Sequence, residues 1–214
     1  MAPRLEDLPT EFAVFPLTGA LLLPKGKLPL NIFEPRYLAM TEDALASGRL
    51  FGMIQPDPTA AAIATGPGLY RVGCLGRLSA FSETDDGRFL ITLTGVIRFA
   101  ITEELALRRG YRRVRGELVR YRADLDPGPQ PIGIERKALM HALRAYFASS
   151  GIKGDWEAID RLPDERLVVT LSMLCPFEPV EKQALLEAET GADRARALLA
   201  LLQMASAGGH ATAS

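Results

Sequence analysis

The hydrophobic pattern of this chain changes its period at a turn-rich segment, residues 124–131, which reads Asp-Leu-Asp-Pro-Gly-Pro-Gln-Pro. Before this segment, short stretches of extended or alternating apolar residues indicate strands. After it, apolar residues recur every three or four positions, which indicates helices. We therefore expect an α+β chain with a β-rich subdomain at residues 1–123 and a helical subdomain at residues 132–206.

Strands are predicted in four parts of the first half, near residues 12–17, 69–81, 89–101 and 111–121. Glycines within them indicate bulges or bends, and we expect the third strand to break at Gly95. Asp85-Asp86-Gly87 predicts a hairpin, because Asp-Gly supplies the positive φ of a tight turn. Many short, kinked strands are typical of a small barrel or a strongly coiled sheet.

One helix is expected inside the β-rich half, because Pro35 favours a helix start and Gly48 a helix end. Five more are expected after residue 131. The first presents one apolar stripe, Ile134, Ala138, Ala142, Ala145 and Tyr146. The next two are capped by Asp155 and Asp164, the fourth runs from Pro179 to Gly191, and the fifth ends at Gly208-Gly209.

Composition limits which partners this chain is expected to bind and in which cellular compartment it is expected to act. The net charge of −1 gives no bulk electrostatic reason to expect nucleic acid or a membrane surface. Cys74 and Cys175 lie far apart and outside any CxxC pair, so we expect reduced structural thiols in a cytoplasmic protein. The first residues lack a signal-peptide core, and no apolar stretch reaches the roughly 18 residues of a membrane span.

Motifs for catalysis, cofactors and metals are missing from the sequence. The nearest text to a phosphate-binding loop ends in Gly26-Lys27-Leu28, with Leu28 in the hydroxyl position and Leu21 in place of the first glycine. His141 and His210 are the two histidines, too few for a typical zinc site. No GxSxG elbow is present, and although a Ser-Lys dyad stays open, no motif points to one. We therefore expect no catalytic residue, cofactor or metal.

An arginine-rich run at residues 108–122 contains one acid, Glu117. Tyrosines at 111 and 121 interleave with the arginines, as in surfaces that stack single-stranded nucleic acid. The candidate nucleic-acid contacts are Arg109, Arg112, Arg113 and Arg115. The alternative is a solvated strand face whose arginines pair with glutamates of the helical half.

Two further segments allow a binding or a structural interpretation. Leu21-Leu22-Leu23 before Pro24 is either an exposed apolar patch for a partner or a buried strand end. Arg36 either belongs to a binding surface or braces the fold by pairing with a carboxylate or carbonyl, while Tyr37 packs inward. Arg98 allows the same two interpretations. The loop at residues 55–68 is either a lip over a peptide groove or a long surface loop.

Several passages together resemble the Lon protease N-terminal domain family: Phe15-Pro16-Leu17, Leu28-Pro29-Leu30-Asn31-Ile32-Phe33-Glu34-Pro35-Arg36-Tyr37, Gly73-Cys74-Leu75-Gly76, Gly95-Val96-Ile97-Arg98-Phe99 and Glu181-Lys182-Gln183-Ala184-Leu185-Leu186-Glu187. The resemblance implies a PUA-like pseudo-β-barrel holding one helix, followed by a C-terminal α-helical bundle. It also implies a stand-alone bacterial chain that has neither the ATPase nor the protease domain.

The function that this resemblance implies is non-catalytic binding of unfolded or partly folded polypeptide, with a protease complex as a further partner. An open barrel edge could add a peptide strand through main-chain hydrogen bonds. The candidate contacts are Leu22, Leu23, Phe33, Arg36 and Arg98. Because PUA-like folds include RNA binders, an RNA-binding module that uses the arginine-rich run is the alternative.

Overall fold

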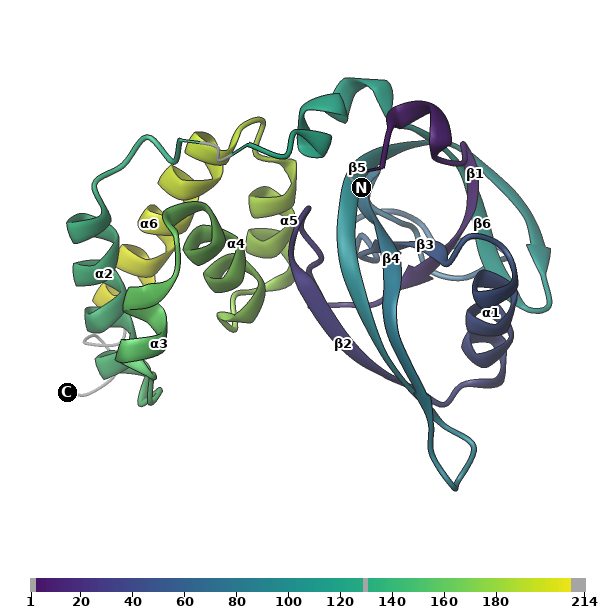
Figure 1. Cartoon of the computed structure of the whole chain (residues 1–214), viewed down its shortest axis with the longest axis horizontal. Coiled ribbons are helices and arrows are strands. Elements are labelled where there is room, and N and C mark those ends of the chain that lie inside the picture. The colour runs from purple at the N-terminus through teal and green to yellow at the C-terminus, as the bar shows by residue number, and fades with distance from the viewer. Residues whose placement is uncertain (1–2, 129–130, 209–214) are drawn as a thin grey trace. The chain divides into compact units, whose positions relative to one another are not determined.

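The structure, a computed structural model, describes residues 3–128 and 131–208. The chain divides into two compact units, Met1–Pro127 and Gly128–Ser214, called here the β unit and the helical unit (Figure 1). The β unit is a six-stranded mixed sheet with one inserted helix, and the second unit is helical, so the predicted α+β class is confirmed. Among the described residues, no helix has the length and apolar character to cross a bilayer.

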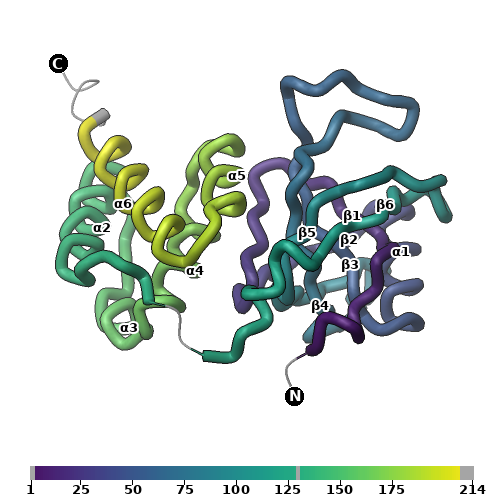
Figure 2. The backbone as a smooth tube through the Cα atoms, turned by 90° about the horizontal axis from the view of Figure 1, so that it is seen from above, coloured from purple at the N-terminus to yellow at the C-terminus, as the bar shows by residue number. Residues whose placement is uncertain are grey.

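The β unit forms a ring because one long strand pairs with three others. Its strands are β1 (Glu11–Pro16), β2 (Lys27–Ile32), β3 (Leu50–Ile54), β4 (Val72–Glu83), β5 (Phe89–Arg108) and β6 (Tyr111–Glu117). The sheet order is β2-β5-β4-β3-β1-β6. The second half of β5 also pairs with β6, which closes the ring, and α1 (Pro35–Ala46) lies at one side of it (Figures 1 and 2). Two short 3-10 segments, η1 (Leu5–Asp7) and η2 (Val119–Leu125), flank the strands.

Strand β5 does not break at Gly95, so that expectation was wrong. The Lys25 N–H donates to the Gly95 carbonyl at 2.9 Å, and the Gly95 N–H donates to the Gly26 carbonyl at 2.9 Å. A Cβ on Gly95 would lie 2.0 Å from the Leu23 carbonyl oxygen. Glycine is therefore needed because the segment after Leu23 crosses directly against β5. The strand continues through Gly95, but its pairing with β4 shifts register between Gly95 and Ile97, so the expected bulge is present.

Two other local predictions in the β unit are confirmed, and a third is correct only in part. The helix from Pro35 is confirmed, and so is the hairpin, where Gly87 has φ 76° between β4 and β5. The last strand is shorter than expected, because β6 ends at Glu117 and Tyr121 lies in η2. Tyr121 packs into a core cluster with nine other buried residues: Leu8, Phe12, Val14, Ile54, Leu75, Ile97, Phe99, Val114 and Leu118.

The helical unit contains α2 (Arg136–Ser150), α3 (Trp156–Arg161), α4 (Asp164–Leu174), α5 (Pro179–Glu187) and α6 (Gly191–Gly208). The stripe predicted for α2 was partly wrong, because Ala138 and Ala145 are exposed. The buried face is instead made by Leu139, Met140, Ala142, Leu143 and Tyr146. Alanines fit a helix anywhere, so the leucines define the buried side more reliably.

Helix ends in this unit follow the sequence in part. The Asp155 carboxylate accepts the Ala158 N–H at 3.0 Å, which confirms that cap. Asp164 is the first residue of α4 and accepts from Arg136 at 2.6 Å, so the predicted cap there was wrong. Gly191 begins α6 and does not end α5. The predicted stop at Gly208-Gly209 lies partly outside the described residues, which end at Gly208. His210 lies outside them as well.

Candidate functional site

Three strands, β2, β5 and β4, present a largely uncharged outer face. Residues paired across neighbouring strands share a face, and successive residues alternate between faces. Asn31 pairs with Leu90 and Leu90 with Ser82, while Pro29 pairs with Thr92 and Thr92 with Ala80. The intervening residues of β5, Phe89, Ile91 and Leu93, are buried on the opposite face. The register therefore places these two rows together on the outside.

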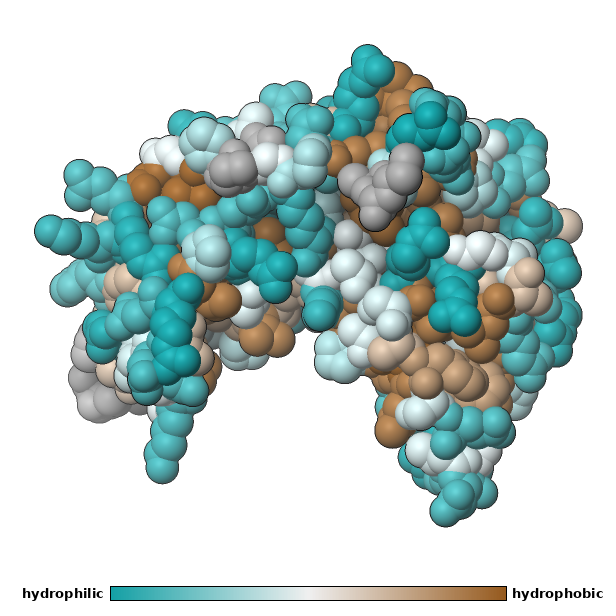
Figure 3. Space-filling model, viewed as in Figure 1, coloured by the Kyte–Doolittle hydropathy of each residue, from teal (hydrophilic) through white to brown (hydrophobic). Residues whose placement is uncertain are grey.

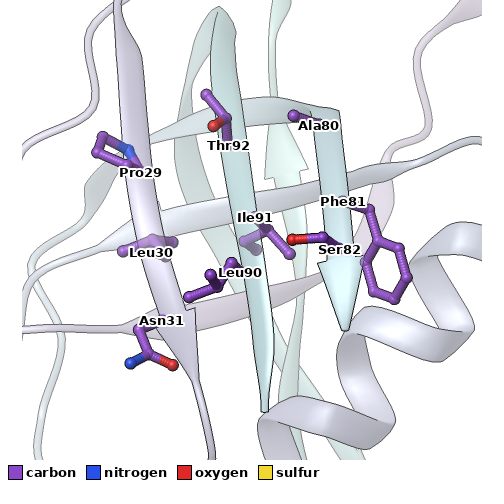
Figure 4. A pocket seen from close by; sticks show the side chains of 9 residues that line it. All are labelled: Pro29, Leu30, Asn31, Ala80, Phe81, Ser82, Leu90, Ile91 and Thr92. Carbon is purple, nitrogen blue, oxygen red and sulfur yellow. The ribbon is translucent and has the colours of Figure 1, made fainter. Parts of the chain in front are cut away.

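This face is hollowed into a depression of about 510 Å³, which we call the outer trough (Figure 4). Its lining is Pro29, Leu30, Asn31, Ala80, Phe81, Ser82, Leu90, Ile91 and Thr92, without a charged residue among them. Leu90 is 45% exposed on this face, whereas Phe81 pairs with Ile91 and its ring packs 5.0 Å from Phe89 on the opposite face. Figure 3 shows apolar surface above the hydrophilic tip of the β4–β5 hairpin. Exposed apolar area of this kind marks interaction surfaces more often than chance.

The trough borders an open strand edge. Strand β2 is at the end of the sheet order, and among the described residues it pairs with β5 alone. The Gly26 carbonyl accepts from β5, and hydrogen-bonded and non-hydrogen-bonded pairs alternate along an antiparallel ladder. The main-chain groups that point away from β5 therefore belong to Lys27, Pro29 and Asn31. Proline has no N–H, so the middle position of this edge can accept a hydrogen bond but not donate one.

Phe33, a predicted contact, lies directly after β2 and is 62% exposed. The Arg88 guanidinium lies 6.0 Å from the centre of its ring, and the same arginine pairs with Asp86 in the hairpin. Arg36, another predicted contact, is half exposed, pairs with Glu34 at 2.8 Å and stacks 4.6 Å above the Tyr37 ring. Phe33 thus extends the apolar surface beyond the end of β2, whereas Arg36 belongs to the start of α1.

Leu22, Leu23 and Arg98 cannot contact a partner from their positions, so these three predicted contacts were wrong. Leu22 is 2% exposed and Leu23 is 0% exposed, because the close crossing at Gly95 holds this segment against the sheet. Arg98 is 5% exposed. Its guanidinium donates to both carboxylate oxygens of Asp124 at 2.9 Å, and its main-chain N–H donates to the same carboxylate at 3.0 Å.

The arginine-rich run is matched by acids of the β unit, not by glutamates of the helical half as expected. Arg109 bonds to Glu42 at 2.7 Å and to Asp43 at 2.8 Å, both on α1. Arg112, with a side chain 6% exposed, bonds to Glu104 at 2.6 Å. Arg113 and Arg115 both pair with Glu11, and Arg115 also pairs with Glu103. A surface in which each of these four guanidiniums already has a carboxylate gives weak support to phosphate binding.

Asp43 ties α1 to the turn between β5 and β6. It accepts from the Tyr111 hydroxyl at 2.6 Å as well as from Arg109. These hydrogen bonds, the Tyr111 one first, hold the pKa of the Asp43 carboxyl below its ordinary value. Burial, followed by the bond to Asp43, raises the pKa of Tyr111 to about 12. The contact is therefore a structural brace at neutral pH.

Groups that could perform chemistry are not gathered near the trough. Among the described residues, no set of three or more His, Cys, Asp or Glu side chains could hold a metal ion. Both cysteines are free and buried, and burial raises the pKa of Cys175 to about 12. A thiol with so high a pKa is a poor nucleophile at neutral pH.

Sequence reasoning missed the residues at the centre of the trough, although one signal was available. Leu90 stands where the strand alternation calls for a polar side chain, between Phe89 and Ile91. An apolar residue on the polar face of an amphipathic strand indicates an exposed contact. Which of these residues meet across strands depends on register, which the alternation does not give.

Comparison with known proteins gives consistent matches. Residues 11–204 match the family described as the ATP-dependent protease La (LON) substrate-binding domain. Lon protease 2 of Thermus thermophilus is 26% identical over 203 residues, which is 92% of this chain and 24% of that protein. The Lon protease of Anaeromyxobacter dehalogenans is 27% identical over 127 residues, 56% of this chain and 14% of that protein. The chain spans at most 24% of the length of the curated relatives it matches.

Two solved structures show the same fold. A Lon N-terminal domain protein from Xanthomonas campestris superposes with a TM-score of 0.59 at 21% identity, covering 90% of this chain and 98% of that one. The N-terminal domain of a Mycobacterium avium complex Lon protease gives a TM-score of 0.63 at 17% identity, with coverage of 90% and 97%.

Proposed function

Because the chain belongs to the ATP-dependent protease La (LON) substrate-binding domain family, we propose that it binds unfolded or partly folded polypeptide without itself catalysing a reaction. The surface that takes the polypeptide is the outer trough with the free edge of β2 beside it. The observation that carries this proposal is the absence of charge among the described residues lining an exposed, partly apolar face.

An unfolded chain differs from a folded one in two properties that this surface can use. Its apolar side chains are accessible, and its main-chain N–H and C=O groups lack internal partners. The trough presents Leu90 to the apolar side chains, and β2 presents outward carbonyls and N–H groups to the main chain. Binding of this kind depends on the polypeptide backbone and on a few apolar contacts, so it accepts many sequences.

Leu90 gives the sharpest test. Burying a leucine completely contributes roughly 1.5–3 kcal/mol, so covering the exposed 45% of Leu90 contributes about 1 kcal/mol, or about fivefold in affinity. Leu90→Asp also forces a carboxylate to lose water on binding, and we expect it to weaken binding by about tenfold or more.

The matched control is Leu107→Asp, because Leu107 is 47% exposed at the other end of the same strand. Fluorescence anisotropy would be measured with a labelled protein kept unfolded by reduction and carboxymethylation, and with the same protein in its native form. We expect saturable binding of the unfolded form, weakened by Leu90→Asp and unchanged by Leu107→Asp. Equal loss in both variants, or no saturable binding of the unfolded form, would refute the proposal.

A module that holds polypeptide and does not cleave it needs a separate enzyme to act on what it holds. We therefore propose that a protease complex is its functional partner. Affinity purification from the native cell, followed by addition of the unfolded protein above, should retain a protease together with the chain. A purified complex that lacks any protease under both conditions would contradict this part of the proposal.

A further inference from the structure

A second, smaller cavity of the β unit lies apart from the outer trough. It measures about 110 Å³ and is formed where the end of β1, the start of α1, the loop after β3 and the β5–β6 turn meet. Its lining residues are Pro16, Arg36, Tyr37, Pro56, Thr65, Pro67, Gly110, Tyr111 and Arg112. Two arginines and two tyrosines line this cavity, which is large enough for one small functional group. None of the four lines the outer trough.

The walls of this cavity are held by contacts around Arg112. Its guanidinium donates to the Pro67 carbonyl at 2.6 Å and to Glu104 at 2.6 Å, which fixes the loop against β6. Gly110 has φ 85°, and a Cβ there would lie 3.3 Å from the Arg36 Cβ. Glycine thus lets the β5–β6 turn pass close to the start of α1. The cavity is therefore a defined feature of the fold, with a rigid rim of three prolines.

Several polar groups of the lining have no hydrogen-bond partner among the described residues. The Tyr37 hydroxyl has none, although Tyr37 is 6% exposed. The Thr65 hydroxyl oxygen is buried and also lacks one. Arg36 pairs with Glu34 through Nε and Nη2, which leaves Nη1 and its main-chain N–H without acceptors. Buried polar groups are normally satisfied, so the Thr65 hydroxyl oxygen, with the Tyr37 hydroxyl and the accessible Arg36 donors beside it, points to a polar ligand.

The groups around the cavity that lack partners can donate hydrogen bonds, which favours a ligand with acceptor oxygens and a low charge. Burial raises the pKa of the Tyr37 hydroxyl; the positive charge of Arg36 lowers it, the negative charge of Glu34 raises it, and Arg112 lowers it. The main-chain N–H of Arg36 lies in the first turn of α1, where the helix dipole also favours an anion. Glu34 and Glu104 each pair with one of the two arginines, which argues against a doubly charged phosphate.

We propose that this cavity binds a carboxylate group. The group would accept hydrogen bonds from the Tyr37 hydroxyl, the Thr65 hydroxyl and the free donors of Arg36. Two sources supply this chemistry, a free small carboxylate and the C-terminal carboxylate of a polypeptide. The site does not depend on polypeptide binding in the outer trough, because the two surfaces share no residue.

The test is a titration followed by amide chemical shifts of the 15N-labelled full-length chain. The probes are acetate, an acetylated tri-alanine peptide with a free C-terminus and the same peptide with an amidated C-terminus. The variants are Tyr37→Phe, which removes one hydroxyl, and Arg36→Gln, with Arg88→Gln as the control because Arg88 is also half exposed and paired with an acid. Melting temperatures would be measured to show that each variant is folded.

We expect acetate or the free-acid peptide to shift the Arg36, Thr65 and Gly110 amides saturably. Tyr37→Phe and Arg36→Gln should each weaken this binding roughly tenfold, since each removes a hydrogen bond to a charged group, and Arg88→Gln should leave it unchanged. A response to acetate alone assigns the site to free carboxylates, and a stronger response to the free-acid peptide assigns it to chain ends. No saturable shift with either probe, or equal shifts with the amidated peptide, overturns the proposal.

Discussion

Removing the carboxylate of Asp124 is expected to destabilise the β unit more than any change at its surface ion pairs. The side chains of Arg98 and Asp124 are 6% and 9% exposed, and three hydrogen bonds join the two residues. The Arg98 guanidinium also lies 4.9 Å from the Tyr121 ring. This pair holds η2 against β5, so its loss affects the packing of the core cluster around Tyr121.

The size of the effect follows from the burial of the charge that remains. Asp124→Ala leaves a guanidinium with almost no access to water, and breaking a buried pair in this way costs about 3–5 kcal/mol. Asp124→Asn keeps one carbonyl oxygen as an acceptor, so we expect a loss of about 2 kcal/mol. Replacing both partners, with Arg98→Met and Asp124→Leu together, should recover most of the stability because no unpaired charge remains.

The assay is equilibrium unfolding in urea, with the two units followed separately. The single tryptophan, Trp156, lies in α3 and reports on the helical unit, so a far-UV circular dichroism transition that does not coincide with the tryptophan transition would report on the β unit. The control is Glu103→Ala, which removes an exposed partner of Arg115 and should cost less than about 1 kcal/mol. If Asp124→Ala costs no more than this control, the buried pair does not have the role assigned to it.

Three further outcomes can be checked in the same preparations. Gly95→Ala should lower the urea midpoint of the β unit sharply because its Cβ meets main-chain atoms, whereas Gly128→Ala, with nothing within 4 Å, should not. The lowered pKa of Asp43 contributes stability that is fully present above its ordinary pKa of about 3.9 and is lost as pH falls through the folded-state value. Asp43→Asn, which weakens the bond from Tyr111, should therefore flatten the acid limb of a stability-against-pH curve; an unchanged limb would contradict this. Cys175 should react with a thiol reagent at pH 8 only in denaturant, because burial raises its pKa to about 12, and rapid labelling of the native chain would show otherwise.

Local signals in the sequence predicted those elements whose cause is local. The helix from Pro35, the hairpin at Gly87 and the Asp155 cap depend on one or two residues and their immediate neighbours, and all three are confirmed. The cap at Asp164 failed because Arg136, 28 positions earlier, takes its carboxylate. An ion pair between distant residues has no signature in a short window of sequence.

The outer trough and the burial of Leu22 and Leu23 are also products of distant contacts. Gly95 indicated a break in β5 when read alone, yet its meaning is set by a segment that crosses the strand about 70 residues away in sequence. The arginine-rich run likewise looked unbalanced because its acids are on α1, β1 and β5. Composition counts such charges correctly, but only strand register shows which of them meet.

Pro29, in the middle of β2, opposes self-association of this protein at high concentration. An exposed strand edge beside apolar side chains is a template on which identical chains stack into fibrils. Pro29 removes one donor from that template, so a second copy of β2 cannot complete a regular ladder along it. The edge is thereby protected against self-association, while its remaining outward main-chain groups, on Lys27 and Asn31, can still bind a polypeptide transiently.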